Sequence, residues 1–303
     1  TGAEEKVAKL PKAYGGAEPR MNRELSNVLE NAEKYQKDFK DDFLSVSVLL
    51  ATLKQAEVFR REPTEEDLND PDTYVVDVGL ELTPERHNFD HHQDRSLPCA
   101  FHLVMKHLGH HDAAMLMFAW YPHMSMMDVS GPYRTAEHLG VDSSVLFASS
   151  SPIDGYIIST FASLESLNAQ NPLYDLMKSL GENMIALIGR KMERLERLKS
   201  EAKVVQVKHL KAVASDIDNF PKLAMELYLR FLDDENIVMS ITPSNRGEGW
   251  ELLRLGDNTI VDFRVIENNP EVLFVHGSGF LAKTHKRLPL EEVIKLACMA
   301  ITE

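Results

Sequence analysis

The chain has 303 residues, enough for two domains of ordinary size that each bury a core. Its 33 Lys and Arg against 47 Asp and Glu give a formal net charge of −14, which argues against a large nucleic-acid interface, because phosphate neutralisation needs a basic face. No apolar run approaches ~20 residues, so no membrane span is expected. The two cysteines are too few for a disulfide framework and fit a reducing compartment.

The first 34 residues are charged and irregular, and from Asn22 a helical pattern places Leu25, Val28 and Leu29 on one side. These three side chains are too few to make a core. We therefore expect residues 1–34 to form an extension that packs on this chain or on a neighbouring one. The chain starts at Thr1 without a signal-peptide pattern, which a cleaved organellar presequence, a trimmed tag or an incomplete N-terminus would each explain.

A buried helix is predicted to begin near Asp41, because the residues from Phe43 to Leu50 are mostly apolar. Asp41 or Asp42 would lie near its N-terminus, where a carboxylate is favourable. Residues 56–60 read as a strand.

The most informative stretch runs from Tyr74 to Gln93. Val75–Val78 is a β-branched run that carries Asp77 and stops at Gly79, as expected of a buried parallel strand that delivers an acid to the carboxyl end of a sheet. Ten residues later come a carboxylate and two imidazoles, Asp90, His91 and His92. Such oxygen and nitrogen ligands suit Mn²⁺, Mg²⁺ or Zn²⁺, and two such clusters together could hold a metal pair.

This stretch, YVVDVGLELTPERHNFDHHQ, resembles the second and third motifs of the DHH phosphoesterase superfamily. More narrowly, it is similar to the MYG-type branch, whose pattern is VVDVGGxYDPxRHRYDHHQ. The resemblance covers residues 35–303 and includes Val275–Phe280, similar to the family's FVHASGFIGG. It implies an α/β fold: a DHH-like parallel-sheet domain at residues 35–170 with Val75–Val78 as an interior strand, and a smaller α+β domain at residues 171–303.

Two of the family's ligand motifs are degenerate in this sequence. Alignment on Phe39 places Tyr35 and Lys40 where the first motif, THNGTFHCDE, has histidines. An ammonium repels a metal cation, and Lys40 is expected to compensate the carboxylates instead. Alignment on Gly131 replaces both aspartates of the fourth motif, DAVDNG, by Met126 and Val129, and Asp128 is expected to point elsewhere.

The remaining ligand candidates could hold one ion but hardly two. They are Asp42, Asp77, Asp90 and His91, with His92 beside them as a fifth residue of the active site if the chain is an enzyme. We therefore expect no cofactor and no two-metal centre. If the chain is an enzyme instead, we expect Mn²⁺ or Mg²⁺ as its cofactor.

Two further motifs could bind ligands. His102, His107, His110 and His111 lie close together but are read as packing and surface residues, since no cysteine pattern accompanies them. The resemblance around residues 275–280 suggests a ligand-binding turn, for which the alternative is a glycine-rich turn between a strand and a helix. Its residues are His276, Gly277 and Gly279.

The C-terminal half is predicted to begin with a long amphipathic helix over residues 173–204, which carries a methionine-rich stripe. Strands are predicted at residues 203–209, 237–242, 249–255 and 271–275, and a last helix at residues 290–301.

Two functions of different class follow. The first is a non-catalytic MYG-type protein kept as a structural or accessory subunit of a larger assembly, with other protein subunits as partners and nucleic acid unfavoured by the charge. A mitochondrial complex such as ATP synthase or the ribosome is the location expected, with cytoplasm or nucleus as the other compartments. The second is a metal-dependent phosphoesterase or 3′–5′ RNA exonuclease with a rearranged site. A module that senses a nucleotide through His276 is a third.

Overall fold

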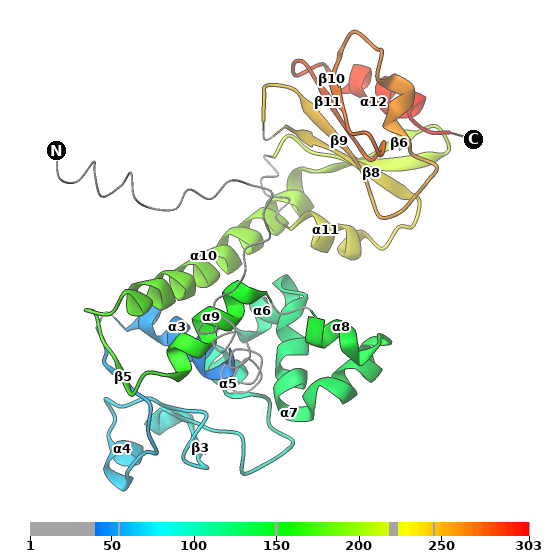
Figure 1. Ribbon diagram of the computed structural model, residues 1–303. Coiled ribbons are helices and arrows are strands. Elements are labelled where there is room, and N and C mark those ends of the chain that lie inside the picture. The colour runs from blue at the N-terminus through cyan, green and yellow to red at the C-terminus, as the bar shows by residue number, and fades with distance from the viewer. Residues whose placement is uncertain (1–39, 54, 149–150, 218–223, 245, 303) are drawn as a thin grey trace, which may run out of the picture.

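The computed structural model describes residues 40–53, 55–148, 151–217, 224–244 and 246–302. The predicted extension, residues 1–34, and Tyr35 lie outside these ranges. Two lobes are joined by one long helix, α10 (Pro172–Glu201), as Figure 1 shows. We call residues 40–171 the N-terminal lobe and residues 203–302 the C-terminal lobe. None of the helices in the described ranges is long and apolar enough to cross a membrane.

The N-terminal lobe is mainly helical, and its centre is the contact between α10 and α3 (Lys40–Thr52). At Gly181 a Cβ atom would lie 2.0 Å from the backbone oxygen of Ser47, so only glycine permits this approach. The buried core around it includes Phe43, Val48 and Met177. The other helices of the lobe are α4 (Glu65–Asn69), α5 (Ala100–His107), α6 (His111–Met117), α7 (Trp120–Leu139), α8 (Ser143–Ala148) and α9 (Pro152–Ala162).

The strands of this lobe are only two residues long. β2 (Val75–Val76), β4 (Asn88–Phe89) and β3 (Leu82–Thr83) form a sheet in the order β2-β4-β3, with β2 parallel to β4 and β3 antiparallel to it. β1 (Val58–Phe59) pairs with β5 (Ser166–Leu167) in antiparallel fashion. A short 3₁₀ helix, η1 (Pro84–Arg86), precedes β4.

The prediction that Val75–Val78 is an interior strand of a parallel sheet is wrong. The strand ends at Val76 and lies at the edge of its sheet, because Asp77 adopts a left-handed backbone conformation with φ 61°. Gly79 and Leu80 also have positive φ, so the chain leaves the strand direction at once. The mixed α/β class is confirmed, but the described residues contain no DHH-like parallel sheet.

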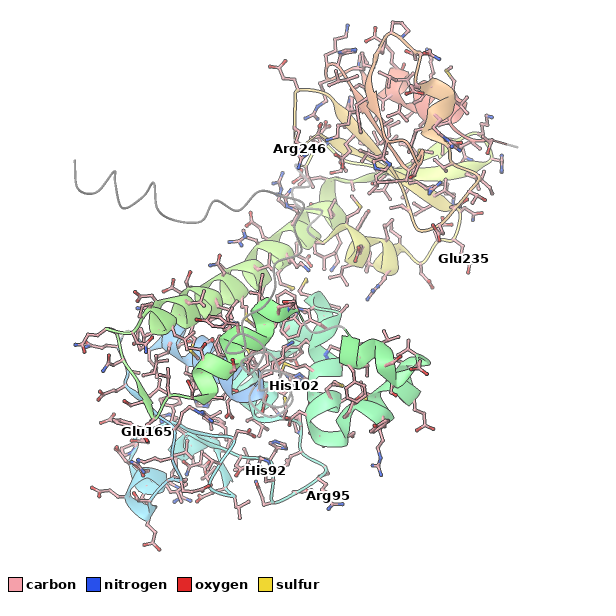
Figure 2. The ribbon with its side chains drawn as sticks, viewed as in Figure 1. His92, Arg95, His102, Glu165, Glu235 and Arg246 are labelled. Atoms are coloured by element: carbon pink, nitrogen blue, oxygen red, sulfur yellow. The ribbon has the colours of Figure 1, made fainter. Side chains whose placement is uncertain are left out.

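The C-terminal lobe contains one six-stranded sheet in the order β10-β11-β9-β8-β7-β6, in which only β7 and β8 are parallel. The second hydrophobic core lies here, and inside it the indole of Trp250 donates a hydrogen bond to the Leu288 carbonyl at 2.8 Å. Figure 2 places Glu235 and Arg246 in this lobe and His92 and His102 in the other. The elements are β6 (Lys203–Val207), β7 (Leu210–Ala214), α11 (Met225–Leu232), β8 (Ile237–Pro243), β9 (Trp250–Arg254), η2 (Phe263–Ile266), β10 (Val272–Val275), β11 (Leu281–Thr284) and α12 (Leu290–Met299).

All four strands predicted for this half and the last helix are confirmed, with ends that differ by a few residues. The long helix is confirmed as α10. The domain limits at residues 35–170 and 171–303 stay a prediction.

Candidate functional site

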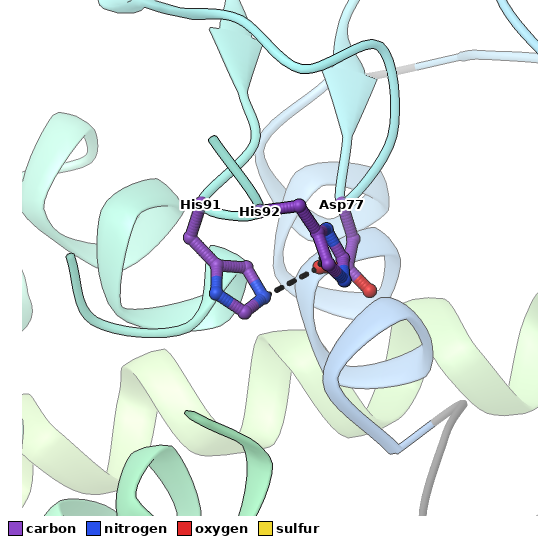
Figure 3. A group of neighbouring side chains, drawn as sticks. All are labelled: Asp77, His91 and His92. Atoms are coloured by element: carbon purple, nitrogen blue, oxygen red, sulfur yellow. Dashed lines mark ion pairs between the residues drawn. The ribbon is translucent and has the colours of Figure 1, made fainter. Parts of the chain in front are cut away.

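Acidic and imidazole side chains from four segments meet in the N-terminal lobe. Asp41 and Asp42 begin α3, Asp77 follows β2, His91 and His92 follow β4, and Asp128 lies on α7. Figure 3 shows how Asp77, His91 and His92 approach one another from the two strand ends. Because β2 and β4 are parallel neighbours, their carboxyl ends deliver these side chains to the same place.

His91 is at the centre of this group. Its Nε2 lies 3.0 Å from Asp77 Oδ1 and 3.2 Å from Asp128 Oδ2. Despite these short distances, neither pair has hydrogen-bond geometry: His91 Nε2 and the two oxygens are buried without a hydrogen-bond partner in the described chain, as is Asp41 Oδ2. An N–H that is aimed at neither oxygen satisfies neither of them. Atoms that converge in this way suit a shared cation.

Asp128 corrects the sequence-based expectation, because it points into the site. It lies on α7 just before Gly131, where the helix kinks with φ 78° and ψ 169°. A shift of one residue in the motif alignment would have matched Asp128 to the family's second aspartate. Met126 and Val129, which the alignment chose, are not among the residues that could hold an ion in the described chain.

Asp41 was also missed as a site residue. Its carboxyl group is 3 % exposed, and its Oδ1 accepts a hydrogen bond of 2.9 Å from the Phe101 amide at the start of α5. Burial, followed by the charges of Asp77 and Asp128, raises the pKa of Asp41 to about 7. From the sequence, Asp41 is predicted only to lie near a helix N-terminus, a prediction that applies equally to Asp42.

The pKa values of two neighbours also reflect this crowding of carboxylates. Burial, followed by the charge of Asp77 and a hydrogen bond with it, raises the pKa of Asp42 well above its usual range. For His91, burial opposes the charged imidazolium, but the adjacent Asp128 and Asp77 outweigh it and raise the pKa to about 10. Without an added cation, the site therefore retains protons.

Asp90 holds its own loop instead of joining the ligand groups. It is 1 % exposed, its Oδ2 accepts a 2.6 Å hydrogen bond from the Leu80 amide, and its Oδ1 lies 2.7 Å from Nδ1 of His92. Burial opposes ionisation, but the hydrogen bonds from His92 and Leu80 outweigh it and lower the pKa of Asp90. Asp90 thus orients His92, whose side chain is about half exposed.

The expected role of Lys40 is not supported. The ion pairs recorded at the site among the described residues involve His91 and His92, whereas Lys40 is exposed at the first position of α3. The charge of Arg60, on the loop after β1, lowers the pKa of Asp42 in part. The imidazole of His91 lies within 3.2 Å of both Asp77 and Asp128 and, when protonated, supplies positive charge to them.

The donor set fits one divalent cation. Two groups of three ligand atoms lie within 4.8 Å of one another in the described chain: Asp77 with His91 and His92, and Asp41 with His91 and Asp128. His91 belongs to both groups, and a single ring nitrogen binds one ion. Buried carboxylate and imidazole atoms without hydrogen-bond partners are the ligands that Mn²⁺, Mg²⁺ or Zn²⁺ accept.

The other histidine cluster is a packing feature. His102 Nε2 lies 2.9 Å from the Tyr121 carbonyl, and its ring stacks on that of Tyr121 at 3.9 Å. His111 Nδ1 is 3.0 Å from the Tyr121 hydroxyl, and His107 meets the ring of Phe89 at 5.0 Å. Burial lowers the pKa of His102 to about 4, so this ring is neutral.

The glycine-rich turn lies in the C-terminal lobe, away from the carboxylates. It joins β10 to β11, so it connects two strands and not a strand and a helix, and the Gly279 amide donates to the His276 carbonyl at 2.7 Å. A Cβ at Gly279 would lie 2.2 Å from Asp262 Oδ1, which gives this glycine a packing role. Ligand binding by His276, Gly277 and Gly279 stays a prediction.

Residues 34–107 match a family model described as an uncharacterised protein family (UPF0160), whose short name denotes a MYG1-type exonuclease. The resemblance to the MYG type is thus confirmed over these residues, which contain Asp41, Asp42, Asp77 and the Asp90–His92 triplet but not Asp128. Residues 1–61 match the Clp repeat (R) N-terminal domain, so the two matches overlap at residues 34–61. No curated protein matches the chain.

Proposed function

We propose that this chain is a non-catalytic MYG-type protein that serves as a structural or accessory subunit of a larger assembly. The observation that carries the proposal is the sharing of His91 between the two possible ligand groups. In-line phosphodiester hydrolysis by two metals needs two ions, each with its own ligands and with room for water and substrate. A set that depends on one imidazole nitrogen supports a single ion at most.

A single ion would be held by His91 together with either Asp77 and His92 or Asp41 and Asp128. Its chemistry would be charge compensation: it would replace the protons that the buried carboxylates otherwise retain. In that role the site stabilises the fold without turnover.

The proposed assembly is organellar, with a mitochondrial complex as the first candidate. Exposed apolar side chains on the helices beyond the site support a protein partner: Tyr133 is 71 % exposed, Ile153 70 % and Tyr156 57 %. They lie on α7 and α9 of the N-terminal lobe. Such side chains gain free energy when another subunit covers them.

A second candidate is a metal-dependent phosphoesterase or 3′–5′ exonuclease with a rearranged site. The observation in its favour is that Asp41 and Asp128 bring two carboxylates to the site beyond those that the motifs identify. With these two carboxylates, the site has more potential metal ligands than its degenerate motifs predict, which brings it closer to the ligand number of a two-metal centre.

Metal content and activity distinguish the two candidates. After dialysis against Mn²⁺ and removal of free ions, the full-length protein should retain no more than about one equivalent of metal and should not hydrolyse RNA or a model phosphodiester. About two equivalents, together with hydrolysis that Asp77→Asn abolishes, would establish the enzyme. Recovery from native extracts as a lone monomer would contradict the subunit role.

A further inference from the structure

A cleft of about 750 Å³ opens beside the carboxylates, between α3, α7, α8 and α10. This volume lies in the range of small-molecule binding sites. Most of its lining is apolar, with three methionine side chains and the ring of Trp120. Methionine adapts its shape to a bound molecule, and an indole face attracts cations. The apolar residues used below are Leu44, Trp120, Met124, Met127 and Met184.

The ionisable side chains that line this cleft are mainly acidic. Asp41, Asp128 and Asp154 contribute carboxylates, and Lys40 contributes one ammonium group at the exposed end of α3. A phosphodiester or another anion would be repelled by this arrangement. A cation would be attracted.

Asp41 identifies where in the cleft a cation would bind. The residue is 3 % exposed and lines the cleft, yet its Oδ2 has no hydrogen-bond partner among the residues described. Its Oδ1 is already used by the Phe101 amide. A buried carboxylate oxygen without a partner is unfavourable, and a hydrogen-bonding cation from a ligand would relieve this.

We propose that the cleft binds an organic cation, in which an ammonium or guanidinium group contacts Asp41 and Asp128 and an apolar body lies against Trp120 and the methionines. The size of the cleft, its apolar walls and the unpartnered carboxylate oxygen of a residue that lines it all match such an amphipathic molecule. The inference rests on the proposed function, because a divalent ion bound by Asp41, His91 and Asp128, alone or in a two-metal centre, would use the same two carboxylates; the organic cation therefore belongs to the metal-free protein.

Monodansylcadaverine is a suitable probe, since it joins a primary ammonium group to a naphthalene body whose fluorescence increases in apolar surroundings. Titration of the full-length protein in EDTA should give saturable enhancement. The N-acetylated probe, which lacks the charge, should bind at least about tenfold more weakly, as expected when a buried charge loses its partner. Equal binding of both probes would overturn the proposal, as would no binding of either.

Variants locate the site. Asp41→Asn keeps an oxygen for the Phe101 amide and should weaken the ammonium probe at least about tenfold, whereas Asp257→Asn, on an exposed turn of the other lobe, should leave binding unchanged. Asp128→Asn gives the same test if Asp41→Asn does not fold, because Asp128 is partly exposed. Unchanged affinity in the folded variant would refute the site.

Metal binding separates this inference from the proposed function. Two equivalents of Mn²⁺ with hydrolysis would end the non-catalytic reading whatever the probe does. If the protein holds at most one equivalent but the two probes bind equally, the non-catalytic reading stands and the cation site fails.

Discussion

The two lobes of this molecule use their backbones in different ways. The C-terminal lobe pairs strands of four to seven residues in a single six-stranded sheet. The N-terminal lobe has two-residue strands in two small sheets, and its site is built from strand ends and helix starts. Asp77, Leu80 and His87, all with positive φ, lie close together in the sequence beside the site, whereas the three such residues of the described C-terminal lobe, Lys208, Ala224 and Asp233, lie on separate connections. Irregular backbone therefore accompanies the candidate site.

This difference has an energetic consequence. A non-glycine residue in the left-handed region costs roughly 1–2 kcal/mol, so the site segment is unfavourable when considered alone. The crowding of carboxylates near one imidazole, which raises the pKa values of Asp41 and Asp42, adds to that cost. The first hydrophobic core, which includes the packing of α3 on α10, must offset both, whereas the second core lies within the C-terminal lobe alone.

The largest effect is expected when this helix contact is broken. Gly181→Ala would place Cβ 2.0 Å from the Ser47 carbonyl oxygen, which belongs to the backbone and cannot rotate away. We expect a loss of about 3 kcal/mol or more in the free energy of unfolding of the N-terminal lobe. Urea titration followed by tryptophan fluorescence measures it, since Trp120 and Trp250 lie in different lobes and Trp120→Phe leaves a reporter for the C-terminal lobe alone.

Gly189 provides the matched control on the same helix. A Cβ there would meet nothing within 4 Å, so Gly189→Ala should stabilise the protein by roughly 0.5–1 kcal/mol through helix propensity. Equal effects of the two substitutions would show that the contact between α3 and α10 does not support the N-terminal lobe.

The same contrast explains how much the sequence could predict. Strands with sustained β-branched or apolar character, such as Ile237–Pro243, were identified, whereas β11, with the sequence LAKT, was missed because four mixed residues carry no period. Helix α7 was missed because Gly131 and Pro132 interrupt it. In the N-terminal lobe, the run at Val75–Val78 contains a strand as predicted, but periodicity could not indicate the left-handed turn at Asp77 that ends it at Val76.

Site residues could be predicted where they belong to a contiguous motif and not where they depend on how helices dock. Asp77 and His91 were found because they belong to contiguous motifs, and the structure brings them to 3.0 Å. Asp41 and Asp128 were missed because their approach depends on how α3 and α7 dock, which no local pattern contains. Asp90 was identified as a ligand on the motif alone, although its oxygens hold the Leu80 amide and His92.

The next effect concerns acid stability. His102 has a pKa of about 4 in the folded protein, because it is buried, and about 6.5 in an unfolded chain. Between these values the unfolded chain binds the proton and the folded protein does not, so stability falls as the pH falls from about 6.5 to about 4. The loss approaches about 3 kcal/mol at the lower limit. His102→Gln should remove this loss, since glutamine can still donate to the Tyr121 carbonyl.

Only the difference between wild type and variant is diagnostic, because Asp41 acts in the opposite direction. Its pKa of about 7 is raised above the unfolded value, so its contribution is present at low pH and is lost as the pH rises from about 4 to about 7. Free energies of unfolding measured at several pH values should diverge below pH 6.5. Parallel curves would mean that His102 is protonated in the fold.

The smallest expected effect is a gain in stability at the site itself. Burial and the adjacent Asp77 raise the pKa of Asp42 well above its usual range, so the carboxyl group resists ionisation. Asn has the shape of the protonated acid and no charge to bury. In EDTA at pH 8, Asp42→Asn should therefore raise the free energy of unfolding by about 1 kcal/mol, as substitutions of functional residues often do. The exposed Asp257→Asn in the C-terminal lobe should change the free energy of unfolding by less than about 0.5 kcal/mol.

Added Mn²⁺ sharpens the test of Asp42: if Asp42 contacts a bound ion, wild type gains stability and the variant gains less. A variant that is less stable than wild type in EDTA would mean that Asp42 is ionised and held by the charge of Arg60, and the contrast between the site segment and the six-stranded sheet would then lose its electrostatic part.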